Sequence, residues 1–469
     1  MLDPKTPGVY IEEISTLPAS IAAVETAIPA FIGYTEKAEK DGNSLALVNV
    51  PTRITSLLEF IKIFGNPNPE TFSLSIDDTY DSISGDLLSR DFNASVPAPS
   101  GFLLYYSLQM YFNNGGGPCY IVSVDTDFSS ITIGTAELLA GIAATEIVDE
   151  PTLLVFPDAV SLGATTNYGE IVQAALIQCN KLQDRFTICD AYNDGTSSSI
   201  GNFRNAIGND YLKYGAAYHP YLKTTLNYAI DDTSTITHTK TDDPGGTPNY
   251  GGALSSLEAS DPSIFRTLQV EMNKQYVSLP PSGAVAGVYA RVDKDRGVWK
   301  APANVGLNST TAPTIRVTHQ QQENLNVDPT AGKSINVIRA FAGKGILVWG
   351  ARTLAGNDNE WRYVPVRRLF IFVEESVKKA SAFVVFEPND ANTWIRVKTM
   401  IENFLTGLWR EGALAGAKPE EAFFVKVGLG ETMTAQNILE GEMIVEIGMA
   451  AVRPAEFIIL KFSHKLQES

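Results

Sequence analysis

Between residues 118 and 191 the chain alternates apolar, β-rich runs with helical patterns, and this alternation constrains the fold more than any other feature. In chain order the segments read CYIVSV, TAELLAGIAATE, TLLVF, GEIVQAALIQCNKL and RFTICDA. Strands that are joined through helices pair in parallel, because each crossover helix returns the chain to the same end of the sheet. We therefore expect an α/β layer in this part of the chain.

Beyond residue 280 the pattern changes to a mixture of helices and hairpins. The run NVIRAFAGKGILVWG predicts a hairpin that turns at Gly343 to Gly345. Apolar residues between Trp394 and Leu408 recur at steps of three and four, which predicts an amphipathic helix. Three further β-rich runs follow: FFVKV, GEMIVEIGMAAV and FIILKFS. The predicted fold class is therefore α/β and α+β, in several domains.

Two segments interrupt this order with many turn-forming residues. Residues 66–101 and 228–262 are rich in Asp, Ser, Thr, Gly and Pro. We interpret both as surface elaborations, the second as an exposed loop or a small polar insertion.

Size and charge exclude several classes of protein. A chain of 469 residues predicts two or three domains, or one domain with insertions. No run approaches the roughly 18 apolar residues of a membrane span, and no signal peptide is recognisable, so we expect a cytoplasmic start and no membrane insertion. The net charge of −17 opposes nucleic-acid binding. Residues 1–280 carry 14 Lys and Arg against 33 Asp and Glu, whereas residues 281–469 carry 22 against 20.

The sequence contains no motif that predicts catalysis, a cofactor or a metal. The three cysteines, Cys119, Cys179 and Cys189, fit neither a disulfide framework nor a zinc site, and we expect buried free thiols. The turn DPTAGKS lacks the first glycine of a phosphate-binding loop, because that position is Val327. The four histidines are too scattered for a helical metal site, and no Gly-x-Ser-x-Gly elbow is present. An enzyme reading rests only on the α/β layering.

The final β-rich run, Phe457 to Phe462, raises the question of what it pairs with. It follows Pro454, and seven residues remain after it. The run pairs either with an upstream strand of its own chain or with another molecule.

Four stretches together resemble the contractile tail sheath proteins of phages and related injection particles. TPGVYIEEI with TAIPAFIGYTEKA is similar to the start of that family, and YFNNGGGPCYIVSV to its central turn and strand. The run PPSGAVAGVYARVDKDRGVWKAPAN is similar to its most recognisable motif, and the segment from INVIRAF to FVEESV continues the resemblance.

The resemblance implies a structural protein without catalytic, cofactor or metal sites. Sheath proteins of this kind assemble with copies of themselves as stacked six-fold rings around an inner tube, and they shorten to drive the tube into a target membrane. Further implied partners are baseplate proteins and a sheath-terminating cap. The implied location is the bacterial cytoplasm during assembly, then a phage tail or a released phage-tail-like particle. A non-contractile paralogue, such as a cap or a baseplate-proximal component, is the alternative.

The resemblance also implies terminal arms that add strands to neighbouring subunits. Two runs correspond to these arms; their residues are Val9, Tyr10, Ile11 and Ile14 at one end, and Phe457, Ile458, Ile459, Leu460 and Phe462 at the other. The first run alternates approximately, which suits a strand with one buried face, and the second is almost continuously apolar. The alternative is that both runs are ordinary strands of their own subunit.

These considerations give a domain plan. It comprises an N-terminal arm (1–20), a segment that joins the core (21–45), a variable outer insertion (46–117), an α/β outer domain (118–280), a C-terminal sheath core domain (281–453) and a C-terminal arm (454–469). Two sets of side chains are candidate contacts. Arg396, Lys398 and Glu402 are candidates for the inner tube, and Arg367 with Arg368 for contacts between subunit bodies.

Overall fold

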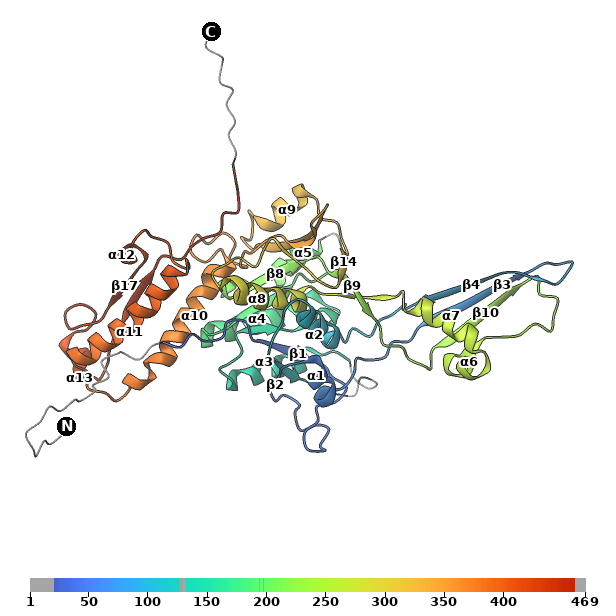
Figure 1. Ribbon diagram of the computed structural model, residues 1–469, viewed down its shortest axis with the longest axis horizontal. Coiled ribbons are helices and arrows are strands. Elements are labelled where there is room, and N and C mark those ends of the chain that lie inside the picture. Colours follow the sequence, from blue (N-terminus) through green and yellow to red (C-terminus); the bar gives the residue numbers. More distant parts are fainter. Residues whose placement is uncertain (1–20, 127, 129–131, 194, 197, 460–469) are drawn as a thin grey trace, which may run out of the picture. The chain divides into compact units, whose positions relative to one another are not determined.

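The computed structural model describes residues 21–126, 128, 132–193, 195–196 and 198–459 (Figure 1). The chain divides into two compact units. We call Glu25–Arg368 the N-terminal unit, and Met1–Val24 with Leu369–Ser469 the C-terminal unit. The protein is a mixed α/β chain with several sheets. None of the described helices is both long enough and apolar enough to cross a membrane.

The N-terminal unit is built on a nine-stranded sheet. In spatial order its strands are β13 (Val305–Gly306), β16 (Gly345–Val348), β15 (Ile335–Phe341), β8 (Gly215–His219), β7 (Phe186–Asp190), β6 (Leu153–Val155), β1 (Pro29–Gly33), β5 (Cys119–Ser123) and β2 (Thr52–Ile54). The six strands from β15 to β5 pair in parallel, and β16, β13 and β2 are antiparallel additions. The predicted parallel α/β layer is therefore confirmed.

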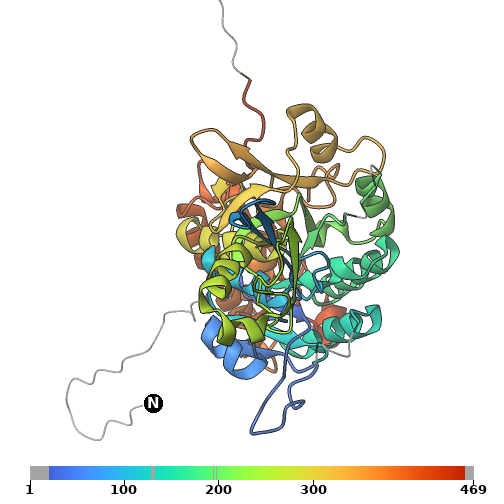
Figure 2. The same ribbon diagram turned by 90° about the vertical axis from the view of Figure 1, so that its right-hand side faces the viewer.

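Helices cover both faces of this sheet. On one face lie α3 (Thr135–Ala144), α4 (Thr165–Leu182) and α5 (Ser199–Ala206), which connect the strands from β5 to β8. Figure 2 shows α3 and α4 as neighbouring teal ribbons. The strands between the layers are buried along their whole length, as their continuous apolar runs predict.

The predicted hairpin at Gly343 to Gly345 is confirmed, because β15 pairs antiparallel with β16 and Phe341 faces Gly345. This hairpin joins the nine-stranded sheet through β15 and β8. One sheet therefore contains strands from both sides of residue 280, and the chain passes from one compact unit to the other at 24/25 and 368/369. The long-range pairing of β15 with β8 has no local sequence signal.

Two further helices that pack on the nine-stranded sheet approach each other unusually closely. Helix α2 (Leu104–Asn113) packs against α8 (Ser282–Arg296), the helix formed by the PPSGAVAGVYARVDKDRG run. A Cβ atom on Gly283 would lie 2.5 Å from the Ser107 carbonyl oxygen, and one on Gly287 would lie 2.5 Å from that of Tyr111. The most recognisable motif of the sequence therefore allows backbone contact between two helices.

We expect Gly287→Ala to destabilise the N-terminal unit by about 1–3 kcal/mol, because the added methyl group meets backbone rather than a movable side chain. The matched control is Gly201→Ala in α5, where a Cβ atom meets nothing within 4 Å. That change should be neutral or stabilising by up to about 1 kcal/mol, since alanine favours a helix. Denaturant unfolding of both variants measures the difference; equal effects would contradict the close contact.

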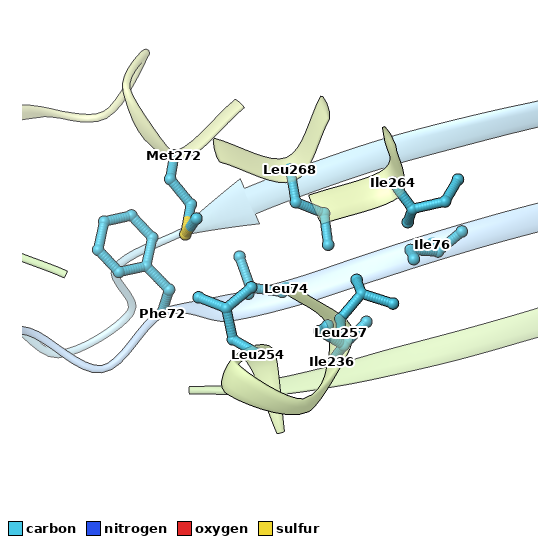
Figure 3. Packing of buried hydrophobic residues seen from close by; sticks show 9 residues of the cluster. All are labelled: Phe72, Leu74, Ile76, Ile236, Leu254, Leu257, Ile264, Leu268 and Met272. Atoms are coloured by element: carbon cyan, nitrogen blue, oxygen red, sulfur yellow. The ribbon is translucent and has the colours of Figure 1, made fainter. Parts of the chain in front are cut away.

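A separate lobe of the N-terminal unit has its own core (Figure 3). Its sheet contains, in spatial order, β11 (Gly252–Ala253), β10 (Thr235–Thr241), β3 (Ser73–Tyr80) and β4 (Leu87–Ser95). Helices α6 (Leu254–Ser260) and α7 (Pro262–Met272) pack on it. The core residues are Phe72, Leu74, Ile76, Ile236, Leu254, Leu257, Ile264, Leu268 and Met272.

This lobe shows that the elaborations expected at residues 66–101 and 228–262 contain regular strands and helices. The two segments pair with each other, since β3 and β10 run parallel with Leu74 opposite Ile236. The turn-forming composition hid an alternating pattern in which Leu74, Ile76 and Tyr80 are buried and their neighbours face outward. Composition therefore gave the wrong answer where periodicity would have predicted a strand.

The remaining elements of the N-terminal unit are short. They are α1 (Leu57–Phe64), η1 (Thr145–Ile147), η2 (Pro157–Ser161), η3 (Leu212–Tyr214), α9 (His319–Asn326) and a three-stranded sheet of β12 (Tyr276–Leu279), β9 (Leu222–Asn227) and β14 (Thr310–Pro313). The run NNGGGPC forms the turn between α2 and β5, as predicted. The buried Asn114 fixes this turn, because its Nδ2 donates to the Met110 carbonyl and its Oδ1 accepts from Asn308 N–H.

The C-terminal unit is smaller. Its elements are the later part of α10 (Val364–Ala380), η4 (Ser381–Val384), α11 (Ala391–Arg410), α12 (Pro419–Ala422), β17 (Phe423–Lys426), α13 (Ala435–Leu439) and β18 (Glu446–Met449). The amphipathic helix predicted from Trp394 to Leu408 is confirmed as α11, which starts at the N-cap Asp390 and buries Val397, Ile401 and Leu408.

Candidate assembly surfaces

Within its described residues the C-terminal unit contains a sheet of two strands. Strands β17 and β18 pair antiparallel from Phe423 opposite Met449 to Lys426 opposite Glu446. In a two-stranded sheet each strand is an edge, and its outer N–H and C=O groups are available for another strand. A sheet of this size has little stability alone, and a neighbouring helix or further strands must support it. Helix α11 packs against β17 on one face.

Gly448 belongs to this sheet rather than to a linker. Gly448 and Pro454, which precede the last β-rich run, are of the residue types that permit a bend in the chain. Gly448 instead lies in β18 opposite Phe424, and a Cβ atom there would lie 2.2 Å from the Phe424 ring. The aromatic side chain therefore covers the glycine, and only Pro454 lies in the irregular segment after β18.

The described part of the last β-rich run belongs to no strand of its own chain. Phe457, Ile458 and Ile459 are 69%, 80% and 80% exposed, and no regular secondary structure includes them. Three successive apolar side chains in solvent are unusual and indicate a binding surface. The other predicted arm residues, Val9, Tyr10, Ile11, Ile14, Leu460 and Phe462, lie outside the described residues.

The predicted tube contacts lie on α11. Arg396 is exposed, and its guanidinium carbon lies 5.5 Å from the centre of the Phe383 ring. Lys398 and Glu402 are half-exposed and form an i,i+4 pair at 4.0 Å. The exposed cation of Arg396 is therefore more available to a partner than the charge of Lys398, which Glu402 partly neutralises.

The candidate body contacts, Arg367 and Arg368, are buried inside the subunit, with 3% of each exposed. The guanidinium of Arg367 lies 4.9 Å from the Tyr214 ring centre and 4.6 Å from that of Trp361. Arg368 forms an ion pair with Asp293. The structure therefore corrects the expectation that these side chains face a neighbouring body.

The lobe contains a buried polar network that the sequence did not reveal. Arg90 donates to both carboxylate oxygens of Asp78, at 2.6 and 2.7 Å. His238 accepts from Tyr250 N–H at Nδ1, so its Nε2 carries the hydrogen that Asp78 accepts at 3.0 Å. The bond from Arg90 is the main cause that lowers the pKa of Asp78. Only the strand register brings residues 78, 90 and 238 together.

Two buried carboxylates accept hydrogen bonds from backbone N–H groups at the N-terminal ends of helices. Asp158 accepts from the backbone N–H of Tyr34 and Leu103, ahead of α2, and Asp190 accepts from that of Ser282, the first residue of α8. Burial raises the pKa of each carboxyl to about 7 and outweighs the opposing backbone hydrogen bonds. These groups anchor helices on the sheet and lie at no open cavity, since both are almost fully buried.

The raised pKa of Asp190 predicts a loss of stability as pH rises. Between about pH 4 and about pH 7 the folded state holds a proton on Asp190 that the unfolded state has released, so the free energy of unfolding falls through this interval and levels off above it. Asp190→Asn keeps an oxygen acceptor for Ser282 and removes the titration. Thermal unfolding at pH 4 to 8 should show a smaller decline for the variant; parallel curves would contradict the assignment.

Backbone N–H groups of the turn before Gly332-Lys333-Ser334 bind the Asp328 carboxylate instead of a phosphate. Asp328 accepts from the backbone N–H of Thr330 and Ala331, both at 3.1 Å. The Lys333 ammonium group donates to the Arg204 carbonyl, inside the protein. The backbone donors that could bind an anion are therefore occupied by Asp328.

Other reactive groups in the described part of the chain form no site. The three cysteines are free and buried, as predicted, and burial raises the pKa of each thiol. Burial lowers the pKa of His219 to about 4. No group of three His, Cys, Asp or Glu side chains among the described residues could hold a metal ion.

Two family profiles match the chain in succession. The profile of the phage tail sheath protein central domain matches residues 132–354, and that of the phage tail sheath C-terminal domain matches residues 356–465. The tail sheath protein of Vibrio phage KVP40 is 24% identical over 39% of this chain and 26% of its own length. For that of Burkholderia phage BcepMu the values are 27%, 37% and 37%. The chain thus spans well under two thirds of these phage relatives.

Solved structures match over the whole chain. A protein of the anti-feeding prophage (AFP) baseplate is 35% identical, with 99% of this chain and 100% of that chain covered and a TM-score of 0.64. A protein of the PVC sheath complex of an extracellular contractile injection system, in its contracted state, is 33% identical, with 99% of both chains covered and a TM-score of 0.66.

Proposed function

Because the chain belongs to the phage tail sheath family, it is a structural sheath protein rather than an enzyme, and we propose that it polymerises around an inner tube and contracts. In this proposal the subunits form stacked six-fold rings. Their collective shortening drives the inner tube through a target membrane. The AFP and PVC proteins, which match along the whole chain, support a phage-tail-like injection particle over a phage tail.

One observation carries the proposal: among the described residues, the sheet of the C-terminal unit has two strands, and an apolar segment beyond it lies outside any strand. Within the described residues no further strand pairs with β17 or β18, and Phe457, Ile458 and Ile459 are exposed beyond β18. A small sheet and an exposed apolar segment of this kind complement each other when copies assemble. Main-chain hydrogen bonds then supply affinity, and alternate side chains supply specificity.

We propose that both terminal arms, Val9 to Ile14 and Phe457 to Phe462, complete the sheets of neighbouring subunits. Backbone pairing depends little on side-chain identity, so the strands can stay paired while the subunit bodies rotate on the segments that lead to them. The segment around Pro454 supplies one such link, because it lies outside any strand. In this arrangement the domain plan places residues 46–117 and 118–280, which include the lobe, on the outside, and residues 281–453 in the sheath core.

We expect deletion of residues 456–469 to leave a folded, soluble subunit that forms no sheath. Of the described residues of this segment, Glu456 is half-buried and Phe457, Ile458 and Ile459 are exposed, so the subunit loses little buried area with them. Circular dichroism and thermal unfolding measure the fold, and electron microscopy measures assembly. An unfolded product would show that the segment belongs to the core of its own subunit.

A matched variant keeps the chain length. Substitution of serine at Phe457, Ile458 and Ile459 preserves the backbone donors and acceptors but removes the apolar surface. We expect it to weaken assembly less than the deletion does, because the main-chain ladder survives. Equal loss in both would indicate that side-chain burial, and not the ladder, holds the arm.

We propose that α11 grips the inner tube through Arg396. Arg396→Glu should then abolish co-sedimentation of assembled sheath with inner-tube protein, by reversing an exposed charge at the contact. Arg410→Glu, at the exposed end of the same helix, is the control with the same charge change and should bind normally. Equal binding by both variants would exclude Arg396 from the contact.

Assembly inside the bacterial cytoplasm, followed by release within a particle, is the location that this function implies, with baseplate and cap proteins as further partners. The alternative function is a non-contractile component on the same fold. The AFP baseplate relative supports that alternative as well as the first function. Electron microscopy of the purified protein separates them, since long hollow cylinders indicate a sheath and single rings indicate a cap.

A further inference from the structure

The chain passes between the two units twice, at residues 24–25 and at residues 368–369. Arg368 is the last residue of the N-terminal unit at one crossing, and Thr26 is the second residue of that unit at the other. The Nη2 atom of Arg368 donates to the Thr26 carbonyl oxygen at 2.7 Å. A single guanidinium group therefore joins the two crossing segments on the side of the N-terminal unit.

This guanidinium is fixed from three directions. Asp293 on α8 accepts two parallel hydrogen bonds, at 3.0 Å from Nη1 and 2.5 Å from Nη2. Tyr289, one turn earlier, offers its ring face at 4.7 Å. The Tyr289 hydroxyl lies 2.7 Å from that of Tyr218 on β8. Contacts thus run from both crossing segments to α8 and on to the nine-stranded sheet.

Because Arg368 and Asp293 are buried, each charge requires the other for compensation. The side chains of Arg368 and Asp293 are only 3% and 5% exposed. A paired buried arginine need not add stability, but removal of one partner leaves an uncompensated charge. The forked geometry also excludes lysine as an equivalent, because an ammonium group cannot bind two carboxylate oxygens in parallel and stack on a ring.

The same two segments also meet within the C-terminal unit. Val24 N–H donates to the hydroxyl of Ser376 on α10 at 3.3 Å, and Ser376 is fully buried. The first crossing segment is therefore hydrogen-bonded to α10 twice. Thr26 binds Arg368 in the N-terminal unit, and Val24 binds Ser376 in the C-terminal unit.

We propose that Arg368 is the positioning residue that fixes both crossing segments to the N-terminal unit, so that a displacement of the C-terminal unit is delivered to α8 and the central sheet at one point. This inference rests on the proposed contraction. In that setting the terminal arms transmit force to the C-terminal unit, and the clamp formed by Arg368, Asp293 and Thr26 passes it on. Without the clamp the two crossing segments would lose the contact that joins them on the side of the N-terminal unit.

The test compares two buried Arg–Asp pairs in the full-length protein. Arg368→Lys removes the fork at the clamp, and Arg90→Lys makes the same change at Asp78 in the lobe, which lies away from either crossing in the sequence. We expect amide hydrogen exchange of the unassembled subunit to rise about tenfold at residues 24–28 and 364–372 in the first variant only. Unchanged exchange there would overturn the clamp.

Electron microscopy then tests the link to contraction. We expect Arg368→Lys sheaths to shorten incompletely and to varied lengths, and Arg90→Lys sheaths to shorten as the wild type does. Full, uniform contraction of Arg368→Lys, with raised exchange, would overturn the role in transmission. If the wild type forms no contractile sheath, the proposed function fails, whereas the exchange result still decides whether the clamp exists. Should Arg368→Lys not fold, Asp293→Asn, which keeps one acceptor oxygen, replaces it in both measurements.

Discussion

The need to pair backbone N–H and C=O groups at sheet edges shapes both units of this chain. In the nine-stranded sheet of the N-terminal unit the need is met inside the chain: β15 arrives from more than a hundred residues away to pair with β8, and the outermost strands, β2 and β13, are only three and two residues long. Such short edges offer little template for another chain. Among the described residues of the C-terminal unit the sheet has two strands, β17 and β18, and an isolated bridge follows between Leu414 and Ala451. The unit with this small sheet is also the unit that contains the exposed Phe457 to Ile459 segment. The difference between a closed and an open sheet is the physical basis for assigning self-assembly to the C-terminal unit.

Local periodicity predicted the elements of this fold better than it predicted their grouping. The strands and helices between residues 118 and 191, the hairpin at Gly343 to Gly345 and the amphipathic helix α11 were all readable, because each depends on neighbours within about 20 residues. The membership of β15 and β16 in the first sheet was not readable, since pairing across a long separation leaves no local mark. The lobe was missed for a different reason. Its strands alternate buried Leu74 and Ile76 with Ser and Asp, and the polar half of that pattern matches the composition of a loop.

The candidate contact residues show the same difference between features with a local sequence signal and features that depend on distant residues. Arg396 was placed on an exposed helix face because the spacing of α11 shows which side is apolar, and the structure agrees that it is exposed. Arg367 and Arg368 are the candidates for contacts between subunit bodies, and such contacts require exposed side chains. Their burial depends on Tyr214, Trp361, Tyr289 and Asp293, which come from other elements and which no pattern near residue 367 reveals. The network of Asp78, Arg90 and His238 was hidden for the same reason. Ionisable groups that sit inside a protein are defined by their partners, and a single sequence does not pair them.

Two kinds of contact therefore have different roles in the proposed machine. Inside the subunit, specific side chains fix the geometry: the Arg368 clamp, the carboxylates that hold the N-terminal ends of α2 and α8, and the glycines that let those helices touch each tolerate few substitutions. Between subunits, the proposed arms rely on main-chain ladders, which accept many sequences and keep their geometry when the bodies turn. A sheath that shortens must keep its subunits rigid and its connections pliable at once. Side-chain clamps suit the first demand because each fixes a specific pair of groups. Backbone ladders suit the second because main-chain hydrogen bonds depend little on side-chain identity. On this view, sequence change is restricted at buried polar residues and tolerated in the arms, provided that the arms stay extended and free of internal prolines.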